Sequence, residues 1–275
     1  ISGTGVMTGV YAYGMVPGNL YLPDDPEKMG VHNVDITNNT ITWVGREFKC
    51  GDGIANMLGY EILIRNNEIA YGTSNGIANG WGWSSREYIV KENTIAFNDV
   101  HHIAMSAVDV AGIYNLNAQK GTQIRANYVH DIQRSGTGHV GAPCYGLYLD
   151  EGSNWLIVTD NETVNNFSNG ILFHNTGGSI YSLGNDTQNE EIMKNAGVGK
   201  AYKSISLRKK SDVGKSLVKN VSLGQPQNSL TGEVGMKVTV KKDMTVKALG
   251  RFYYLGNSEI HNLTIYDETN GSVVA

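Results

Sequence analysis

The sequence predicts an all-β protein, a right-handed parallel β-helix followed by an antiparallel β-sandwich segment. Short aliphatic alternations that end in asparagine recur through residues 30–175, and a second set of short glycine-containing strands interleaves with them. The apolar residues of this region show no helical periodicity. Two strands per repeat are each too short to be stable alone, so neighbouring coils must bury each other's apolar faces, as in a solenoid.

The first repeated element is an aliphatic strand that leads to a corner. It occurs at residues 34–41, 62–69, 89–95, 123–129 and 157–164, and its shared asparagines are Asn39, Asn67, Asn93, Asn127 and Asn161. Asparagine tolerates left-handed backbone and can hydrogen-bond the amides of a turn. We therefore expect these asparagines to stack at one corner of the coils, where they have a structural role.

The second element is a strand with a glycine at its centre. Its glycines are Gly53, Gly76, Gly112, Gly146 and Gly170. Two positions after the glycine, Tyr114 and Tyr148 occupy adjacent coils, and four positions after it stand Asp150 and His174. Neighbouring strands lie about 4.8 Å apart, so these side chains are expected to meet on one outward face.

The charge distribution marks a change near residue 190. Residues 1–189 hold 9 Lys and Arg against 18 Asp and Glu, whereas residues 190–275 hold 13 against 8. Simple apolar alternation replaces the repeat after about residue 195, which predicts a β-helix over residues 1–195 and a partial β-sandwich of carbohydrate-binding type over 196–275. No aromatic residues interleave with Lys209, Lys210, Lys241 and Lys242, so we expect a solvated basic face and no nucleic-acid partner.

Composition and chain ends narrow the class of protein further. The 275 residues include 34 Gly, 5 Pro and 17% charged residues, which is typical of a folded, turn-rich chain. No stretch approaches eighteen apolar residues, so we expect no membrane span. The chain starts at Ile1 without Met or a leader and ends at Ala275 inside a predicted module, so we expect truncation at both ends.

Neither cysteine nor histidine spacing predicts a metal site. Cys50 and Cys144 are far apart in the sequence, and we expect two buried free thiols. The pair His101-His102 lacks the helical spacing of zinc-binding histidines, and His130 beside Asp131 falls at a repeat corner. We expect no metal and no cofactor.

Carboxyl groups on or near this outward face are the candidates for catalytic residues. Glycosidic cleavage uses an acid that protonates the leaving oxygen and a second carboxylate that acts as nucleophile or activates water. The candidates are Asp109, Asp150 and Glu151, with Asp99 and Asp131 placed less favourably. Relative to the repeat glycine, Asp109 and Asp150 differ by seven positions, about 23 Å along a straight strand. They can cooperate only if the chain turns sharply between these positions.

The segments 106–114, 124–132 and 145–153 carry the sequences SAVDVAGIY, IRANYVHDI and YGLYLDEGS. Together they resemble the core of the β-helix glycoside hydrolases of family 141, which includes α-L-fucosidases and xylanases. The resemblance extends over about residues 30–175, with a tract at 79–83 similar to a Gly-Trp-rich stretch of such proteins. It implies a right-handed β-helix and two catalytic aspartates, which by motif fall on Asp109 and Asp150.

The sequence thus predicts a secreted glycoside hydrolase, extracellular or periplasmic, that acts as a monomer on a cell-wall polysaccharide or its oligosaccharides. Aromatic faces pack against sugar rings, and the substrate-binding candidates are Tyr114, Tyr148, Trp81, Trp83, Glu151, His174 and Trp155. The alternatives are a non-catalytic carbohydrate-binding or adhesion β-helix, an inactive fragment, and a polysaccharide lyase or uronate epimerase. The last would need a cationic cluster for the uronate carboxylate, and the arginines of this acidic region are scattered.

Overall fold

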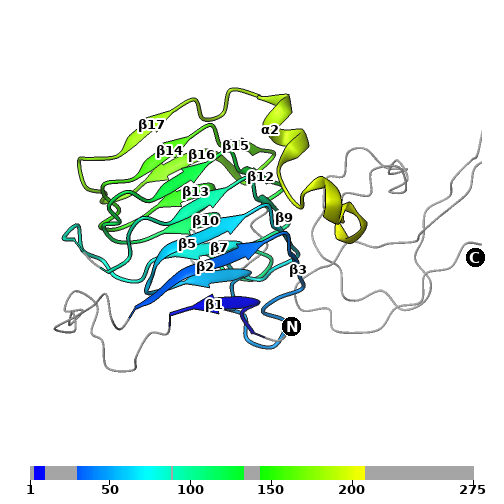
Figure 1. Ribbon diagram of the computed structural model, residues 1–275, viewed down its shortest axis with the longest axis horizontal. Coiled ribbons are helices and arrows are strands. Elements are labelled where there is room, and N and C mark those ends of the chain that lie inside the picture. The colour runs from blue at the N-terminus through cyan, green and yellow to red at the C-terminus, as the bar shows by residue number, and fades with distance from the viewer. Residues whose placement is uncertain (1–2, 10–29, 88, 133–142, 208–275) are drawn as a thin grey trace, which may run out of the picture. The chain divides into compact units, whose positions relative to one another are not determined.

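The computed structural model describes residues 3–9, 30–87, 89–132 and 143–207, and it confirms the parallel β-helix (Figure 1). All strand pairs within its three sheets are parallel. Sheet A consists of β1 (Val6–Thr8), β4 (Ile54–Asn56), β7 (Ile77–Asn79), β10 (Val110–Asn115), β13 (Cys144–Leu149) and β16 (Ser168–Phe173). Sheet B consists of β2 (Val31–Thr37), β5 (Gly59–Arg65), β8 (Thr94–Ala96), β11 (Gln123–Arg125), β14 (Ile157–Thr159) and β17 (Tyr181–Leu183). Sheet C consists of β3 (Thr40–Thr42), β6 (Glu68–Ala70), β9 (Asp99–His101), β12 (Tyr128–His130) and β15 (Glu162–Val164).

The register of sheet A follows the glycine repeat. Ile113 pairs with Ile77 on one side and with Leu147 on the other, and Leu147 pairs in turn with Ile171. The predicted column of Tyr114, Tyr148 and Leu172 is therefore present. The two tyrosine rings meet edge to face, with centroids 5.0 Å apart and planes at 89°, and do not stack in parallel.

A ladder of asparagines, buried except at its two ends, links successive coils at the corner between sheets B and C. Each member donates through its Nδ2 to the Oδ1 of the next over 2.9–3.0 Å. Its members are Asn39, Asn67, Asn98, Asn127, Asn161 and Asn185. The prediction was wrong at Asn93, which lies at another corner and accepts a hydrogen bond from the backbone N–H of Ile62. In that coil the strand that pairs with β5 is β8, which starts directly after Asn93. The asparagine that follows this strand is Asn98, five residues after Asn93, and it is the one that bonds Asn67.

The interior is filled by one aliphatic cluster, to which every sheet contributes β-branched side chains. Ile64, Ile95 and Ile124 of sheet B are fully buried, as are Ile69 and Val100 of sheet C. Burying such a side chain contributes roughly 1.5–3 kcal/mol each, which explains why strands of three residues persist in this stack. The core also explains one repeat glycine, because a Cβ on Gly112 would come within 2.2 Å of Val129 Cγ1.

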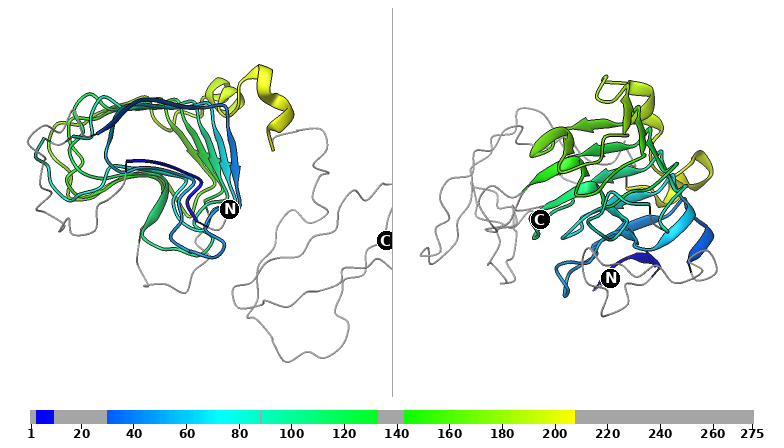
Figure 2. Two further views of the ribbon diagram at one scale, coloured as in Figure 1. Left: turned by 60° about the horizontal axis from the view of Figure 1, so that its bottom comes forward. Right: turned by 90° about the vertical axis from the view of Figure 1, so that its left-hand side faces the viewer.

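Residues 186–207, which we call the strap, cross the outer side of sheet C. The strap contains the helix α2 (Glu190–Asn195) and the 3₁₀-helix η1 (Lys200–Ile205), which lie beside sheet C in Figure 2. The Asn189 side chain caps α2, and the Gly197 N–H donates to the Phe97 carbonyl at 2.8 Å. The first compact unit runs to Arg208, past the boundary predicted at residue 195. The predicted β-sandwich lies outside the described residues.

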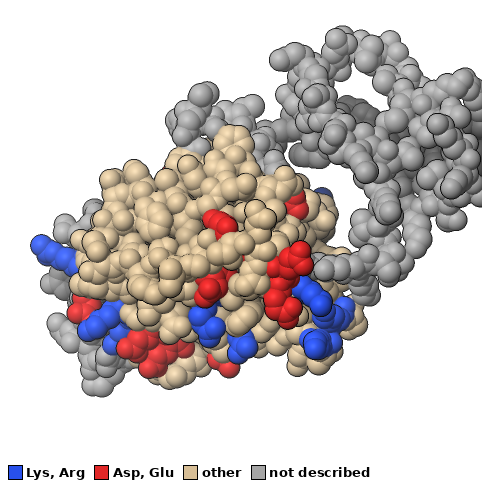
Figure 3. Space-filling view, turned by 90° about the horizontal axis from the view of Figure 1, so that it is seen from above, with Lys and Arg blue, Asp and Glu red and all other residues tan. Residues whose placement is uncertain are grey.

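The surface of the described part is unevenly polar. Viewed from the end of the stack that carries β17 and α2, charged side chains gather along one margin, and much of the remaining face carries none (Figure 3). Some of the large exposed apolar side chains belong to the last coil, namely Phe167, Phe173, Tyr181 and Leu183. Both cysteines are free, and Cys144 is buried as expected, whereas Cys50 is exposed. Among the described residues, no helix combines the length and apolarity that a membrane crossing requires.

Candidate active site

The outer face of sheet A carries a cluster of carboxyl, phenol and imidazole groups, which three consecutive strands position. Asp109 precedes β10, which carries Tyr114, and Tyr148 lies on β13. Asp150 and His174 follow directly after β13 and β16, at matching positions of adjacent coils. Side chains alternate between the core and the surface along a strand, so the aliphatic neighbours of the tyrosines fill the core and the rings face outward.

Both carboxylate oxygens of Asp150 are hydrogen-bonded. The Tyr114 hydroxyl donates to Oδ2 over 2.5 Å, and His174 Nδ1 lies 2.7 Å from Oδ1. The backbone N–H of Asp150 donates to the carbonyl of Asn115 over 2.9 Å. The Asp150 side chain is buried and is held in one orientation by groups from three coils.

The Tyr148 side chain joins the two predicted catalytic aspartates. It is buried, with 2% of its surface exposed, and its hydroxyl interacts with the carboxyl groups of both Asp109 and Asp150. Burial and the negative charges of the two aspartates raise the pKa of the Tyr148 hydroxyl far above its usual range. Burial and Asp150 raise the pKa of the Tyr114 hydroxyl in the same way. Both phenols therefore stay protonated and act as hydrogen-bond donors.

Asp109 lies at the open side of the cluster. It is exposed as a residue, but its carboxyl group is partly desolvated, and this burial together with the nearby Asp150 charge raises the pKa of Asp109. Its backbone has a φ of 61°, a left-handed conformation that Asp tolerates better than most residues. The chain thus turns where it enters β10, and the sheet A strands curve in the left view of Figure 2. The two aspartates share one tyrosine despite their offset in the repeat.

His174 and Glu151 complete the cluster. His174 is exposed, and its hydrogen bond to Asp150 raises the pKa of its imidazole. Glu151 is half-buried and accepts a hydrogen bond from Asn175 Nδ2 over 3.2 Å. Its negative charge also raises the pKa values of both Asp109 and His174. The structure therefore brings together six of the sequence-predicted site residues, which are Asp109, Tyr114, Tyr148, Asp150, Glu151 and His174.

The three predicted tryptophans lie in the loops that flank this cluster. Trp81 and Trp83 contact each other edge to face, with ring centroids 5.4 Å apart. Their loop continues to Ser84, which packs so closely on Gly152 that a Cβ there would lie 2.5 Å from the Ser84 carbonyl. Trp155 is exposed and lines a groove of about 690 Å³ beside sheet B, together with Tyr181 and Lys120. This groove contains neither of the two aspartates.

A second group of polar side chains lies on sheet C, and the sequence analysis did not predict it. Glu68, Asp99 and His101 form the group of metal-type side chains found in the described part of the chain. All three are buried, and they belong to adjacent strands β6 and β9. Recognising them requires the register of sheet C, because Glu68 and Asp99 face each other only once those strands are aligned. Placing Asn98 instead of Asn93 in the asparagine ladder fixes the alignment of β9 with β6.

The sheet A cluster has the parts that acid-base chemistry on a polar substrate requires. Asp109 holds its proton to higher pH than an ordinary aspartate, whereas Asp150 is bonded by two donors that suit a carboxylate. An acid with a raised pKa beside a second carboxyl group that is held in one orientation is typical of glycoside-cleaving sites. The cluster is also open on the Asp109 side, where a substrate can approach.

Comparison with known proteins defines the class of the molecule. Residues 30–187 match the family model described as the right handed β-helix region, so the chain belongs to this family. It is similar to a solved structure described as a glycoside hydrolase, with 29% sequence identity and a TM-score of 0.65. The alignment covers 74% of this chain and 34% of that chain, so this chain spans about a third of its length. No curated protein matches the sequence.

Proposed function

We propose that this protein is a glycoside hydrolase in which Asp109 and Asp150 act on a sugar bound over the outer face of sheet A. The observation that carries the proposal is the placement of both carboxyl groups around one buried tyrosine, Tyr148, with Asp150 held in position by Tyr114 and His174. The likeness to a solved glycoside hydrolase supports the same class. Because a fold by itself does not define a function, the two aspartates matter as well: Asp109 has a raised pKa, and both oxygens of Asp150 are hydrogen-bonded.

Each aspartate has a role that follows from its surroundings. Asp109, with its raised pKa, donates a proton to the leaving glycosidic oxygen. Asp150 acts as the carboxylate on the other side of the bond, where it stabilises positive charge at the anomeric carbon or activates the attacking group. Tyr114 and His174 hold the Asp150 carboxylate in place. Tyr148 fixes the position of one carboxyl relative to the other.

The charges of the cluster favour a neutral sugar over a uronate. Asp109, Asp150 and Glu151 would repel a substrate carboxylate, and His174 is the basic side chain that these groups surround. A polysaccharide lyase or uronate epimerase would need cationic groups at this place to neutralise its substrate. We therefore propose a neutral glycan, and the finer assignment to family 141, with α-L-fucosidase or xylanase activity, rests on the sequence resemblance. Secretion and a monomeric state are part of the proposal.

The test is hydrolysis of neutral polysaccharides and aryl glycosides, including fucosides and xylan, by the full chain and three variants. Asp150→Asn is expected to lose about 10³-fold or more in kcat/KM on every substrate. Asp109→Asn is expected to lose about 10²–10⁴-fold on polysaccharides. On nitrophenyl glycosides its loss should be much smaller, because a nitrophenolate leaves without a proton. Asp35→Asn, which changes an exposed aspartate of sheet B, is the matched control and should behave like the wild type.

A non-catalytic carbohydrate-binding β-helix is the second candidate. It is favoured by the full engagement of both Asp150 oxygens in hydrogen bonds within the protein. Affinity electrophoresis on the same polysaccharides distinguishes the two functions. Retardation without any sugar release, from protein whose circular dichroism shows the folded β-structure, would contradict the hydrolase and support the binding module.

A further inference from the structure

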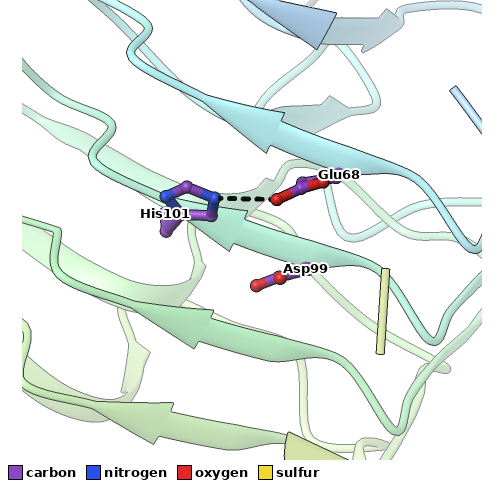
Figure 4. A group of neighbouring side chains, drawn as sticks. All are labelled: Glu68, Asp99 and His101. Carbon is purple, nitrogen blue, oxygen red and sulfur yellow. Dashed lines mark ion pairs between the residues drawn. The ribbon is translucent and has the colours of Figure 1, made fainter. Parts of the chain in front are cut away.

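The buried group on sheet C carries an inference that is independent of the proposed hydrolase. Asp99 and His101 lie two residues apart on β9, so both side chains point outward, and Glu68 pairs with Asp99 on the adjacent strand β6. The three side chains lie close together on neighbouring strands (Figure 4). One ligand-type atom from each lies within 4.8 Å of the others.

Burial makes this group different from an ordinary surface cluster. Glu68 and Asp99 are fully buried, and His101 is 6% exposed. Buried charges in proteins are paired or coordinate a metal ion. His130 lies 2.9 Å from Asp99 and 2.7 Å from Asp131. Two carboxyl groups and one imidazole thus face one another where solvent is excluded.

The orientation of His101 points to a ligand in particular. Its Nε2 atom is buried, has no hydrogen-bond partner among the described residues, and lies 3.5 Å from Glu68 Oε1. His101 Nδ1 lies 2.8 Å from His102 Nδ1. In the tautomer where His101 Nδ1–H donates to His102, Nε2 presents a lone pair toward the two carboxylates. Metal-bound histidines are held in the same way, by a hydrogen bond from the ring nitrogen that does not bind the metal.

We propose that Glu68, Asp99 and His101 form a binding site for one divalent transition-metal ion of the zinc type. Zinc bonds of about 2.0–2.2 Å place neighbouring ligands of a tetrahedron roughly 3.4 Å apart, close to the separation of His101 Nε2 and Glu68 Oε1. One imidazole with two carboxylates suits zinc better than Ca²⁺, which takes six to eight oxygens. The strap also holds one of these ligands, because the Leu207 N–H donates to the other oxygen of Glu68 over 2.7 Å.

The closure of the strap over this point is built into the backbone. Gly197 has a φ of 88°, and a Cβ on it would lie 3.0 Å from the Cβ of Asp99. The strap thus lies directly against one of the three ligands. A metal ion would enter when the strap opens or while the chain folds, so the test must offer both routes.

The test is the binding of Zn²⁺ and Co²⁺ to the full chain after chelator dialysis, both to the folded protein and during refolding. We expect one equivalent per chain and, with Co²⁺, the visible absorption of a four- or five-coordinate ion. Ca²⁺ should not compete. His101→Ala is expected to weaken Zn²⁺ binding by about 100-fold or more, beyond the effect typical of residues that only orient a ligand. Glu68→Gln, which keeps the shape of the side chain, should have a similar effect.

His32→Ala, which removes an exposed histidine stacked on Tyr60, is the matched control and should bind one equivalent like the wild type. The proposal is overturned if wild-type protein refolded with Zn²⁺ binds less than stoichiometric metal. It is also overturned if folded His101→Ala binds as tightly as the control, or if Ca²⁺ displaces Zn²⁺. The wild-type measurement decides even if the variants fail to fold.

Discussion

Sheets A and C both carry carboxyl and imidazole groups from successive coils on their outer faces, but only the group on sheet C is covered. Asp109 and His174 of the sheet A cluster are exposed, whereas Glu68 and Asp99 of sheet C are fully buried beneath the strap. The same repeat geometry therefore produces two kinds of site. Stacked strands place polar side chains of successive coils next to one another. Where a segment such as the strap covers them, they can stabilise the fold, and where no described segment covers them, they are accessible to a ligand.

The contrast extends to what the carboxylates bind. On sheet A, Asp150 is bonded by side chains of the β-helix itself, Tyr114 and His174. On sheet C, the buried carboxylates accept hydrogen bonds from the backbone of the strap, as Glu162 does from Gln188 and Asn189. Substitutions in the first group should therefore change activity, and substitutions in the second should change stability.

The largest effect is expected from Glu162→Ala on the covered side. Glu162 is 1% exposed and accepts hydrogen bonds from the Thr187 hydroxyl and from the backbone N–H groups of residues 187–189. Hydrogen bonds to a charged group contribute roughly 1.5–3 kcal/mol each, so we expect a loss of about 3–5 kcal/mol in the free energy of unfolding. Urea denaturation measures it, and amide exchange should increase across the strap. Glu47→Ala, in an exposed loop, is the control.

A smaller effect, on activity and not on stability, is expected from Tyr148→Phe on the open side. The substitution keeps the buried ring and removes the hydroxyl that joins the two aspartates. Losing one donor of this kind costs about 10²-fold in kcat, while the melting temperature should stay close to that of the wild type. Tyr145→Phe on the same strand is the matched control. Equal activity of both variants would remove Tyr148 from the mechanism.

The smallest effect is a shift of pH dependence in Glu151→Gln. The Glu151 charge is one cause of the raised pKa of Asp109, so its removal lowers that pKa. The acid then loses its proton at lower pH, and the basic limb of kcat/KM should move to lower pH by less than about one unit, or 1.4 kcal/mol. His174 has a pKa raised by the same charge, so the shift must persist in a His174→Gln background. A basic limb that stays in place would contradict the role of Asp109 as the acid.

Particular residues show why the sequence predicted this architecture well. The glycine repeat predicted the register of sheet A, including the column of Tyr114 and Tyr148 and the adjacency of Asp150 and His174. A local pattern suffices there, because equal spacing from a repeated residue becomes equal height in the stack. The pattern failed at Asn93, since two asparagines five residues apart both follow aliphatic runs, and only the packing of β8 selects Asn98.

The sequence by itself determined the repeat, the apolar face of each strand and the polar and aromatic residues on the outer face of the last coils. These features depend on side-chain alternation within a few residues. Only the tertiary structure decided which polar groups meet. It turned the chain at Asp109, placed Tyr148 between two aspartates, and closed the strap over Glu68, Asp99 and His101. The physical reason is that these contacts join residues far apart in the chain, whose proximity depends on backbone turns and covering segments that no local pattern encodes.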